Sequence, residues 1–158
     1  MNNSLQGQVA LVTGASRGIG AAIADMLAAG GARVFGTATS HKGAESITQR
    51  QVEGLSGLTL NVNDMDAISS VLAEIASQAS APTILVNNAG VTRDQLLMRM
   101  SEEDWETVLN TNLRSVYRLS KACLRGMMKA RKGRIISIAS VIGSMGNAGQ
   151  ANYAAAKA

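Results

Sequence analysis

The most informative stretch of this chain is Val9-Ala10-Leu11-Val12-Thr13-Gly14-Ala15-Ser16-Arg17-Gly18-Ile19-Gly20. Its first residues form an unbroken apolar run, which is typical of a short strand buried on both faces of a parallel sheet. Glycines follow in the spacing Gly-x-x-x-Gly-x-Gly, and Ile23, Met26 and Leu27 then recur at helical spacing. A glycine-rich turn between a strand and a helix lets backbone N–H groups come close to a phosphate. We therefore predict a nucleotide-binding loop; glycines that merely permit a tight turn are the alternative.

Strand and helix patterns alternate along the rest of the chain. Further strands are predicted at 32–39, 58–62, 84–86 and 134–140. Helices are predicted from Gly20 to Gly30, at 41–52, from Asn63 or Asp64, from Ser101 through Cys123, and from near Asn152, with a glycine-rich loop at 143–149. Such alternation is typical of an α/β fold with a parallel sheet and right-handed crossovers. We predict a single doubly wound, Rossmann-like domain over residues 1–158, with five strands in the order 3-2-1-4-5.

Composition narrows the class of protein. The chain is 46% hydrophobic and 16% charged but only 3% aromatic, so its core must be aliphatic. The single cysteine, Cys123, excludes an internal disulfide and fits a reducing compartment. Neither a signal peptide nor an apolar run of about 18 residues is apparent, and we expect a soluble, cytoplasmic protein. The net charge of +4 favours anionic partners, but the basic residues are not grouped with aromatic ones, so nucleic acid is not expected.

The end of the predicted second strand indicates which dinucleotide would bind. Sites that prefer NAD usually have an Asp or Glu there to hold the ribose 2′-hydroxyl. This chain has Thr37-Ala38-Thr39-Ser40, and Arg17 lies in the glycine loop. Because a cation and hydroxyl groups suit a 2′-phosphate, we predict NADP (NADPH) as the cofactor. His41 and Lys42 could add to this site; a solvated surface position is their alternative.

Tyr153 and Lys157 lie four residues apart in the alanine-rich end of the chain. If this run is a helix, the two side chains share one face. An ammonium group beside a phenol favours the phenolate and lowers the tyrosine pKa from its usual value of about 10. Such a tyrosine could exchange protons near neutral pH. The same spacing is also common on ordinary helices, so the pair alone leaves both interpretations open.

Several stretches together resemble the short-chain dehydrogenase/reductase family. Residues 13–20 match its TGxxxGxG cofactor loop, and Asn87-Asn88-Ala89-Gly90 matches its NNAG segment. The catalytic Asn-Ser-Tyr-Lys set of the family is matched by Asn112, Ser140, Tyr153 and Lys157. The motifs occur in family order and span Val9 to Ala158. Residues 86–100 and 146–153 further resemble the branch that reduces 3-oxoacyl groups on acyl carrier protein in fatty acid synthesis; reductases of acetoacetyl-CoA share much of this pattern.

The resemblance implies a role for each of these residues and no metal. Tyr153 would donate a proton to the ketone oxygen while NADPH supplies the hydride. Lys157 would lower the tyrosine pKa and hold the nicotinamide ribose, and Ser140 would donate a hydrogen bond to the ketone oxygen. Asn112 would interrupt its helix and hold a water that relays protons to Lys157. The implied cofactor-binding residues are Gly14, Ala15, Ser16, Arg17, Gly18, Ile19, Gly20, Thr39, Asn61, Val62, Asn88, Ala89, Gly90, Tyr153 and Lys157.

The resemblance also implies partners. Lys129, Arg131 and Lys132 cluster at the end of the long helix, and in the family an arginine at the Arg131 position helps to dock the acidic acyl carrier protein. Favourable charge at a helix C-terminus is the alternative. Complete family members form homotetramers and have two more strands and a segment that covers the substrate. We therefore expect this chain to be an incomplete, poorly soluble and inactive fragment; a non-catalytic NADP-binding or subunit-interacting module is the alternative.

Overall fold

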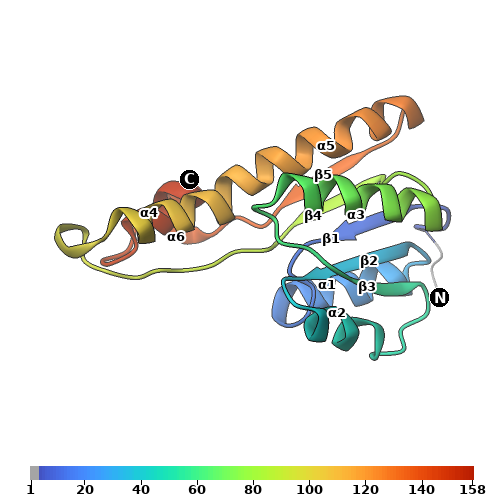
Figure 1. Ribbon diagram of the computed structural model, residues 1–158, viewed down its shortest axis with the longest axis horizontal. Coiled ribbons are helices and arrows are strands. Elements are labelled where there is room, and N and C mark those ends of the chain that lie inside the picture. The colour runs from blue at the N-terminus through green and yellow to red at the C-terminus, as the bar shows by residue number, and fades with distance from the viewer. Residues whose placement is uncertain (1–3) are drawn as a thin grey trace.

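The computed structural model describes residues 4–158 and contains a five-stranded parallel sheet. The strand order is β3-β2-β1-β4-β5, which confirms the predicted order (Figure 1). The strands are β1 (Val9–Val12), β2 (Arg33–Ala38), β3 (Leu55–Thr59), β4 (Ile84–Asn87) and β5 (Arg134–Ser137). The α-helices are α1 (Gly18–Ala29), α2 (His41–Thr48), α3 (Met65–Gln78), α4 (Glu102–Leu109), α5 (Ser115–Ala130), α6 (Val141–Met145) and α7 (Ala151–Lys157). A 3₁₀ turn, η1 (Leu97–Arg99), and a π-helical segment, η2 (Asn110–Arg114), complete the fold.

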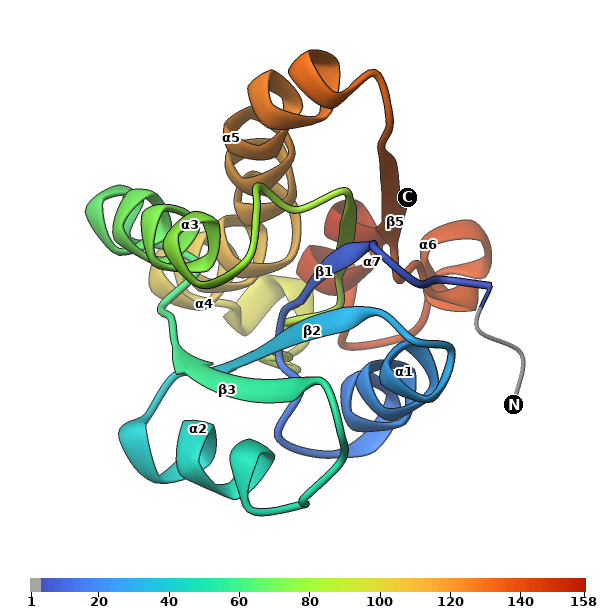
Figure 2. The ribbon, with the colours of Figure 1, turned by 90° about the vertical axis from the view of Figure 1, so that its right-hand side faces the viewer.

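Helices cover both faces of the sheet, with α1 and α2 on one side and α3 and α5 on the other (Figure 2). Successive residues of a strand point to opposite faces, and β1 follows this rule. Val9 and Leu11 belong to the apolar cluster under α3 and α5, whereas Ala10 and Val12 belong to the cluster under α1. Burial on both sides explains why β1 reads as a continuous apolar run.

The long helix predicted from Ser101 forms α4, η2 and α5 in succession. Ser101 caps it as expected, since its Oγ accepts a hydrogen bond from Asp104 N and donates one to the Asp104 carboxylate. The predicted interruption at Asn112 is present as η2, where Ser115 N donates to Asn110 O across five residues. A π-helical turn widens the helix by one residue and often lies at a functional site.

Four predicted boundaries were wrong. β3 runs from Leu55 to Thr59 rather than over 58–62, because pairing with β2 starts at Val34 and the chain then leaves the sheet. β5 ends at Ser137 rather than at residue 140, since its partner β4 ends at Asn87. The helix predicted at 41–52 stops at Thr48, and Gln51 adopts a left-handed conformation with φ of 54°. Part of the predicted loop at 143–149 is helical, because Ser140 caps α6.

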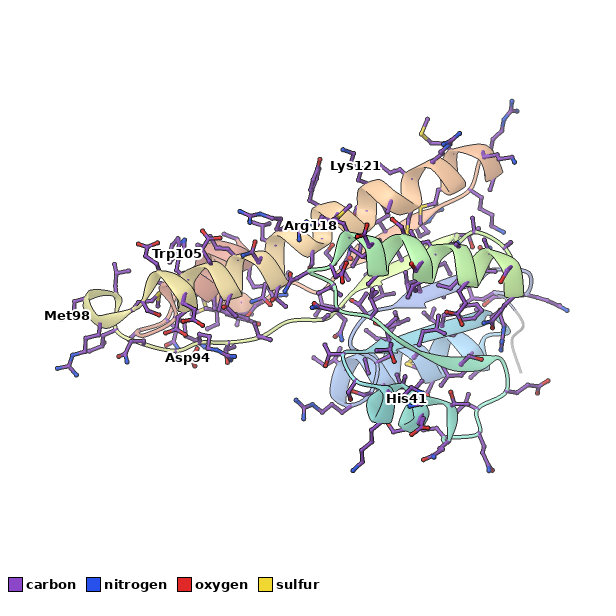
Figure 3. All side chains as sticks on the ribbon, in the orientation of Figure 1. His41, Asp94, Met98, Trp105, Arg118 and Lys121 are labelled. Carbon is purple, nitrogen blue, oxygen red and sulfur yellow. The ribbon has the colours of Figure 1, made fainter. Side chains whose placement is uncertain are left out.

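At one end of the molecule α4, α6 and α7 pack together beyond the sheet and form an arm (Figure 1). Met98 in η1 extends from the tip of this arm and is 87% exposed, and Asp94 and Trp105 also lie on the arm (Figure 3). All four residues of β5, an edge strand, are exposed. Within residues 4–158, no helix combines the length and the apolar character required to cross a bilayer.

Cys123 on α5 offers a test of this packing. Its side chain is 3% exposed, and burial raises the pKa of its thiol from 9.0 to about 11. We expect the thiol to react with a disulfide reagent at pH 8 only after the protein is unfolded. Because the folded-state pKa is the higher one, its stabilising contribution is complete below pH 9 and is lost as pH rises to 11. Relative to Cys123→Ala, the free energy of unfolding should fall by roughly 2–3 kcal/mol over that range. Rapid labelling of the folded protein would contradict the burial.

Candidate functional site

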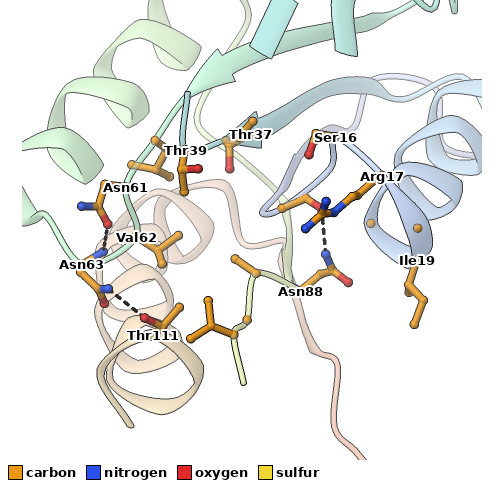
Figure 4. A pocket seen from close by; sticks show the side chains of 18 residues that line it. Ser16, Arg17, Ile19, Thr37, Thr39, Asn61, Val62, Asn63, Asn88 and Thr111 are labelled. Atoms are coloured by element: carbon orange, nitrogen blue, oxygen red, sulfur yellow. Dashed lines mark hydrogen bonds between the residues drawn. The ribbon is translucent and has the colours of Figure 1, made fainter. Parts of the chain in front are cut away.

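A cavity of about 590 Å³ lies at the carboxyl ends of β1, β2, β3 and β4 (Figure 4). The chain passes from β1 to β2 on one side and from the neighbouring β4 to β5 on the other side, so the cavity lies at a topological switch point. Ligands of open α/β sheets bind in the crevice at this position. Most of the predicted cofactor-binding residues line it, namely Gly14, Ser16, Arg17, Gly18, Ile19, Gly20, Thr39, Asn61, Val62, Asn88, Ala89 and Gly90.

Thr13, the residue after β1, joins the glycine loop to the loop after β4. Its buried Oγ accepts hydrogen bonds from Asn88 N and Ala89 N, both at 3.0 Å, and donates to Val86 O at 3.3 Å. In return, Asn88 Nδ2 donates to Thr13 O at 2.9 Å and to Gly14 O at 3.1 Å. These bonds fix the two loops on either side of the cavity relative to each other.

Three glycines of the loop are required by the backbone. Gly14 and Gly18 have φ values of 66° and 57°, in the left-handed region that side chains rarely adopt. A Cβ at Gly20 would collide with the Gly14 carbonyl oxygen and the Asn88 amide. The glycines therefore give the loop its shape and let it approach a ligand closely.

The charge distribution around the cavity suits an anionic ligand. Arg17 is the one charged residue among those that line it. Arg17 is also the N-cap of α1, which has no side-chain cap and no acidic residue in its first turn. The unpaired N–H groups and the positive end of the helix dipole are thus available to a phosphate.

Sequence reasoning missed four wall residues. Leu60, Asn63, Val91 and Thr111 line the cavity, as do Thr37 and Ala38 from the segment predicted to suit a 2′-phosphate. Asn63 Nδ2 donates to Thr111 Oγ1 at 2.9 Å and so connects the loop after β3 to η2 (Figure 4). The only sequence signal for Leu60, Asn63 and Val91 is that they lie in or after predicted strands, and Thr111 has none. Ala15, predicted to bind cofactor, is completely buried beneath the loop and does not line the cavity.

His41 and Lys42 lie outside the cavity lining. His41 is exposed on α2, with its Nδ1 3.3 Å from the Glu45 carboxylate (Figure 3). Lys42 is exposed beside it. The placement agrees with the surface alternative for both residues.

Tyr153 and Lys157 lie side by side on α7, with Lys157 Nζ 6.0 Å from the centre of the tyrosine ring. Lys157 Nζ donates a hydrogen bond to Ile138 O at 2.7 Å, and burial lowers its pKa from the ordinary value of 10.5. Ser140 Oγ accepts a hydrogen bond from Ile142 N at 3.2 Å, which caps α6. None of Ser140, Tyr153 and Lys157 lines the cavity.

Asn112 in η2 connects this group to the cavity wall. Its buried side chain forms two hydrogen bonds with the backbone of Val91, from Val91 N to Oδ1 at 2.8 Å and from Nδ2 to Val91 O at 2.7 Å. A Cβ at Gly90 would lie 2.8 Å from Asn112 Oδ1, so the loop passes directly over the amide. The side chain of Asn112 therefore holds the loop after β4.

Asn152, which the sequence did not single out, fixes the start of α7. Its side chain is completely buried, and its Oδ1 accepts a hydrogen bond from Tyr153 N at 2.8 Å. Its Nδ2 donates to Arg93 O at 3.0 Å and lies 3.4 Å from Asp104 O. One amide thus joins the residue before Tyr153 to the loop after β4 and to α4.

Asn152→Ala should destabilise the arm. The substitution leaves the Arg93 carbonyl without its donor in a site from which water is excluded, and removes the bond to Tyr153 N. We expect a loss of about 1–3 kcal/mol in the free energy of unfolding, measured by urea denaturation. Asn147→Ala, which removes an exposed amide bonded to Gln150, is the matched control and should change the stability by less than about 0.5 kcal/mol. Equal effects of the two substitutions would contradict the assigned role.

The basic residues at the end of α5 lie far from the cavity. Lys129, Arg131 and Lys132 are exposed and immediately precede β5. They therefore lie toward the amino ends of the parallel strands, whereas the cavity lies at the carboxyl ends. The 16 residues of α5 span about 24 Å between η2 and this cluster.

Comparison with known proteins gives a consistent family. The family described as short chain dehydrogenase matches residues 8–158. The chain is 59% identical over 155 residues to "3-oxoacyl-[acyl-carrier-protein] reductase FabG" of Vibrio harveyi. It is 60% identical to the proteins of the same name from Escherichia coli strain K12, over 155 residues, and Pseudomonas aeruginosa, over 159 residues. Each comparison covers 98% of this chain and 64% of the relative, so the chain spans about 64% of the length of these relatives.

Proposed function

We propose, from the premise that this chain belongs to the short-chain dehydrogenase family, that it takes part in the NADPH-dependent reduction of 3-oxoacyl-[acyl-carrier-protein]. The product would be the 3-hydroxyacyl form, an intermediate of fatty acid synthesis in the cytoplasm. The observation that carries the proposal is the identity of 59–60% to reductases of that name over 98% of the chain.

The cavity supports NADP as the cofactor. The pyrophosphate would bind at the N-terminus of α1, where the glycine loop leaves backbone N–H groups free. The adenosine 2′-phosphate would lie near Arg17, Ser16 and Thr39, and no carboxylate among the lining residues would repel it. When bound, NADPH supplies the hydride for the reduction.

The hydrogen bonds at the proposed catalytic residues leave the required donors free. Ser140 Oγ accepts its bond from Ile142 N, so its own O–H can be donated to a ketone oxygen. Lys157 uses one of its three N–H groups on Ile138 O, and the other two can reach ribose hydroxyls. Tyr153 would give its phenol proton to the ketone oxygen as the hydride reaches the carbon. Asn112 would contribute through η2, where it holds the loop against the cofactor and, in the proposed relay, a water.

Tyr153→Phe tests the reaction. The loss of NADPH absorbance would be followed with acetoacetyl-[acyl-carrier-protein] and with acetoacetyl-CoA. In a protein of the relatives' full length that carries this sequence, removal of the proton donor should lower the rate by about 10²–10⁴-fold. Ser69→Ala on the exposed face of α3 removes a hydroxyl far from the proposed catalytic group and should keep the full rate.

Each result separates the proposal from its alternatives. A full rate in Tyr153→Phe would remove the tyrosine from the mechanism. A strong preference of the unaltered protein for the CoA thioester would identify an acetoacetyl-CoA reductase. For a protein of the relatives' full length, NADPH binding without turnover of either substrate would favour a non-catalytic or subunit-interacting module; for the 158-residue chain alone, the same result is expected of an inactive fragment.

We propose that complete copies associate through α5, as the homotetramer predicted from the resemblance requires. Leu113 at the end of η2 and Tyr117, Leu124 and Met128 on α5 recur at helical spacing and are between 45% and 74% exposed. Such an exposed apolar stripe is typical of a surface that pairs with another chain. If two α5 helices pair in opposite directions, the Arg131 cluster of one copy comes close to the cavity end of the other.

Carrier docking at Arg131, with Lys129 and Lys132, depends on that pairing. Charge reversal by Arg131→Glu should raise the KM for the acidic carrier-linked substrate about tenfold and leave the KM for acetoacetyl-CoA unchanged. Arg99→Glu, on the exposed tip of the arm, is the control for a general change of charge. An equal rise for both substrates would mean that Arg131 supports the fold or the assembly rather than the carrier.

A further inference from the structure

A second arginine, Arg50, contacts the glycine loop without lining the cavity. Its Nη1 donates a hydrogen bond to Ala15 O at 3.1 Å. Its Nη2 lies 3.2 Å from Asp25 Oδ1 on α1, and the Arg50 side chain is 22% exposed. A single guanidinium group thus joins the segment after α2, the glycine loop and α1.

This contact fixes the direction of one peptide group in the loop. Ala15 is held at both backbone atoms, because its N donates to Thr37 O at 2.8 Å and its O accepts from Arg50. The chain contains no cis peptide bond among residues 4–158, so the carbonyl of Ala15 and the N–H of Ser16 point in opposite directions. Arg50 therefore sets the direction of the Ser16 N–H, away from itself. In the described part of the chain this N–H makes no hydrogen bond, and Ser16 lines the cavity beside Arg17.

Only part of the hydrogen-bonding capacity of the Arg50 guanidinium is satisfied. Nε and Nη2 of Arg50 and Oδ1 of Asp25 are shielded from solvent and make no hydrogen bond within residues 4–158, although the ion pair brings opposite charges together. Because Asp25 neutralises the charge, the effect of Arg50 on the cavity comes mainly from the orientation of the loop. Shielded donors without partners cost stability, so each one calls for an explanation such as a functional role.

We propose that Arg50 is a positioning residue that makes the site prefer NADPH to NADH. The inference rests on the proposed function, in which the 2′-phosphate lies near Ser16 and Arg17. Arg50 holds the Ser16 peptide so that its N–H and hydroxyl face this phosphate. The pyrophosphate, which both cofactors share, binds at the N-terminus of α1 and does not depend on that peptide.

Arg50→Met tests the proposal, since methionine keeps the apolar stem and removes the donors. Dissociation constants for NADPH and NADH would be measured by calorimetry, so that no turnover is needed. We expect NADPH to bind about tenfold more weakly and NADH to change by less than about twofold. Arg50→Lys retains one donor and should lie between. The control, Arg33→Met, removes an arginine bonded to Ser56 Oγ on β3, away from the loop, and should alter neither constant.

The outcomes are distinct. Equal weakening of both cofactors would show that Arg50 only stabilises the loop, and unchanged constants would show that the Ala15 contact is irrelevant; either overturns the proposal. If the unaltered protein does not prefer NADPH to NADH, the assignment of NADP as the cofactor is wrong. The proposal for Arg50, which depends on that assignment, is then rejected with it. Should thermal unfolding show that Arg50→Met does not fold, Arg50→Lys decides. It keeps the positive charge beside Asp25 but replaces the guanidinium bonded to Ala15 O, so it should still weaken NADPH selectively, and a uniform effect on both cofactors would again overturn the proposal.

Discussion

The hydrogen bonds between Thr13 and the loop after β4 are the contact on which the rest of the site depends. Parallel strands place their carboxyl ends at the same edge of the sheet, but they do not by themselves order the loops that follow. Thr13 and Asn88 exchange bonds in both directions and so hold the glycine loop against residues 88 and 89. From there the same loop reaches Asn112 through Val91 and Asn152 through Arg93. The segment 88–93 therefore contacts the cavity, the π-helical turn and the residue before Tyr153.

Most of the fold could be predicted because its signals are local. Apolar runs identify β1 and β4, and the spacing of Gly14, Gly18 and Gly20 identifies the loop that follows β1. The boundaries of β3 and β5 could not be found in the same way. Leu60 and Val62 are buried at every second position after Leu58, as in a strand, but they lie beyond the end of β3 and line the cavity. β5 ends where its partner β4 ends, and the residues near Ser137 carry no sequence signal for that position.

The site was predicted less completely for the same physical reason. Motif residues such as Ser16, Arg17 and Asn88 line the cavity because the motif describes the turn itself. Arg50 and Asn152 act across 35 and 59 residues of sequence, and neither belongs to a periodic pattern. Ala15 also lies inside the motif, but its small side chain faces the core. Whether a residue lines the cavity therefore depends on the direction of its side chain, which its position relative to a motif does not determine.

The two halves of the site are stabilised by different forces. The cavity rests on the sheet, where Leu11, Val12 and Val86 are completely buried between two apolar clusters. The arm has little apolar burial: α6 has no buried residue, and α7 buries only Asn152 and Ala156. Its position depends on hydrogen bonds such as those of Asn152 and those between Gln150 and Asp94. Hydrogen bonds contribute less per group than apolar burial but demand a particular geometry. The group proposed to donate the proton is consequently the part of the site whose position is most sensitive to single polar substitutions.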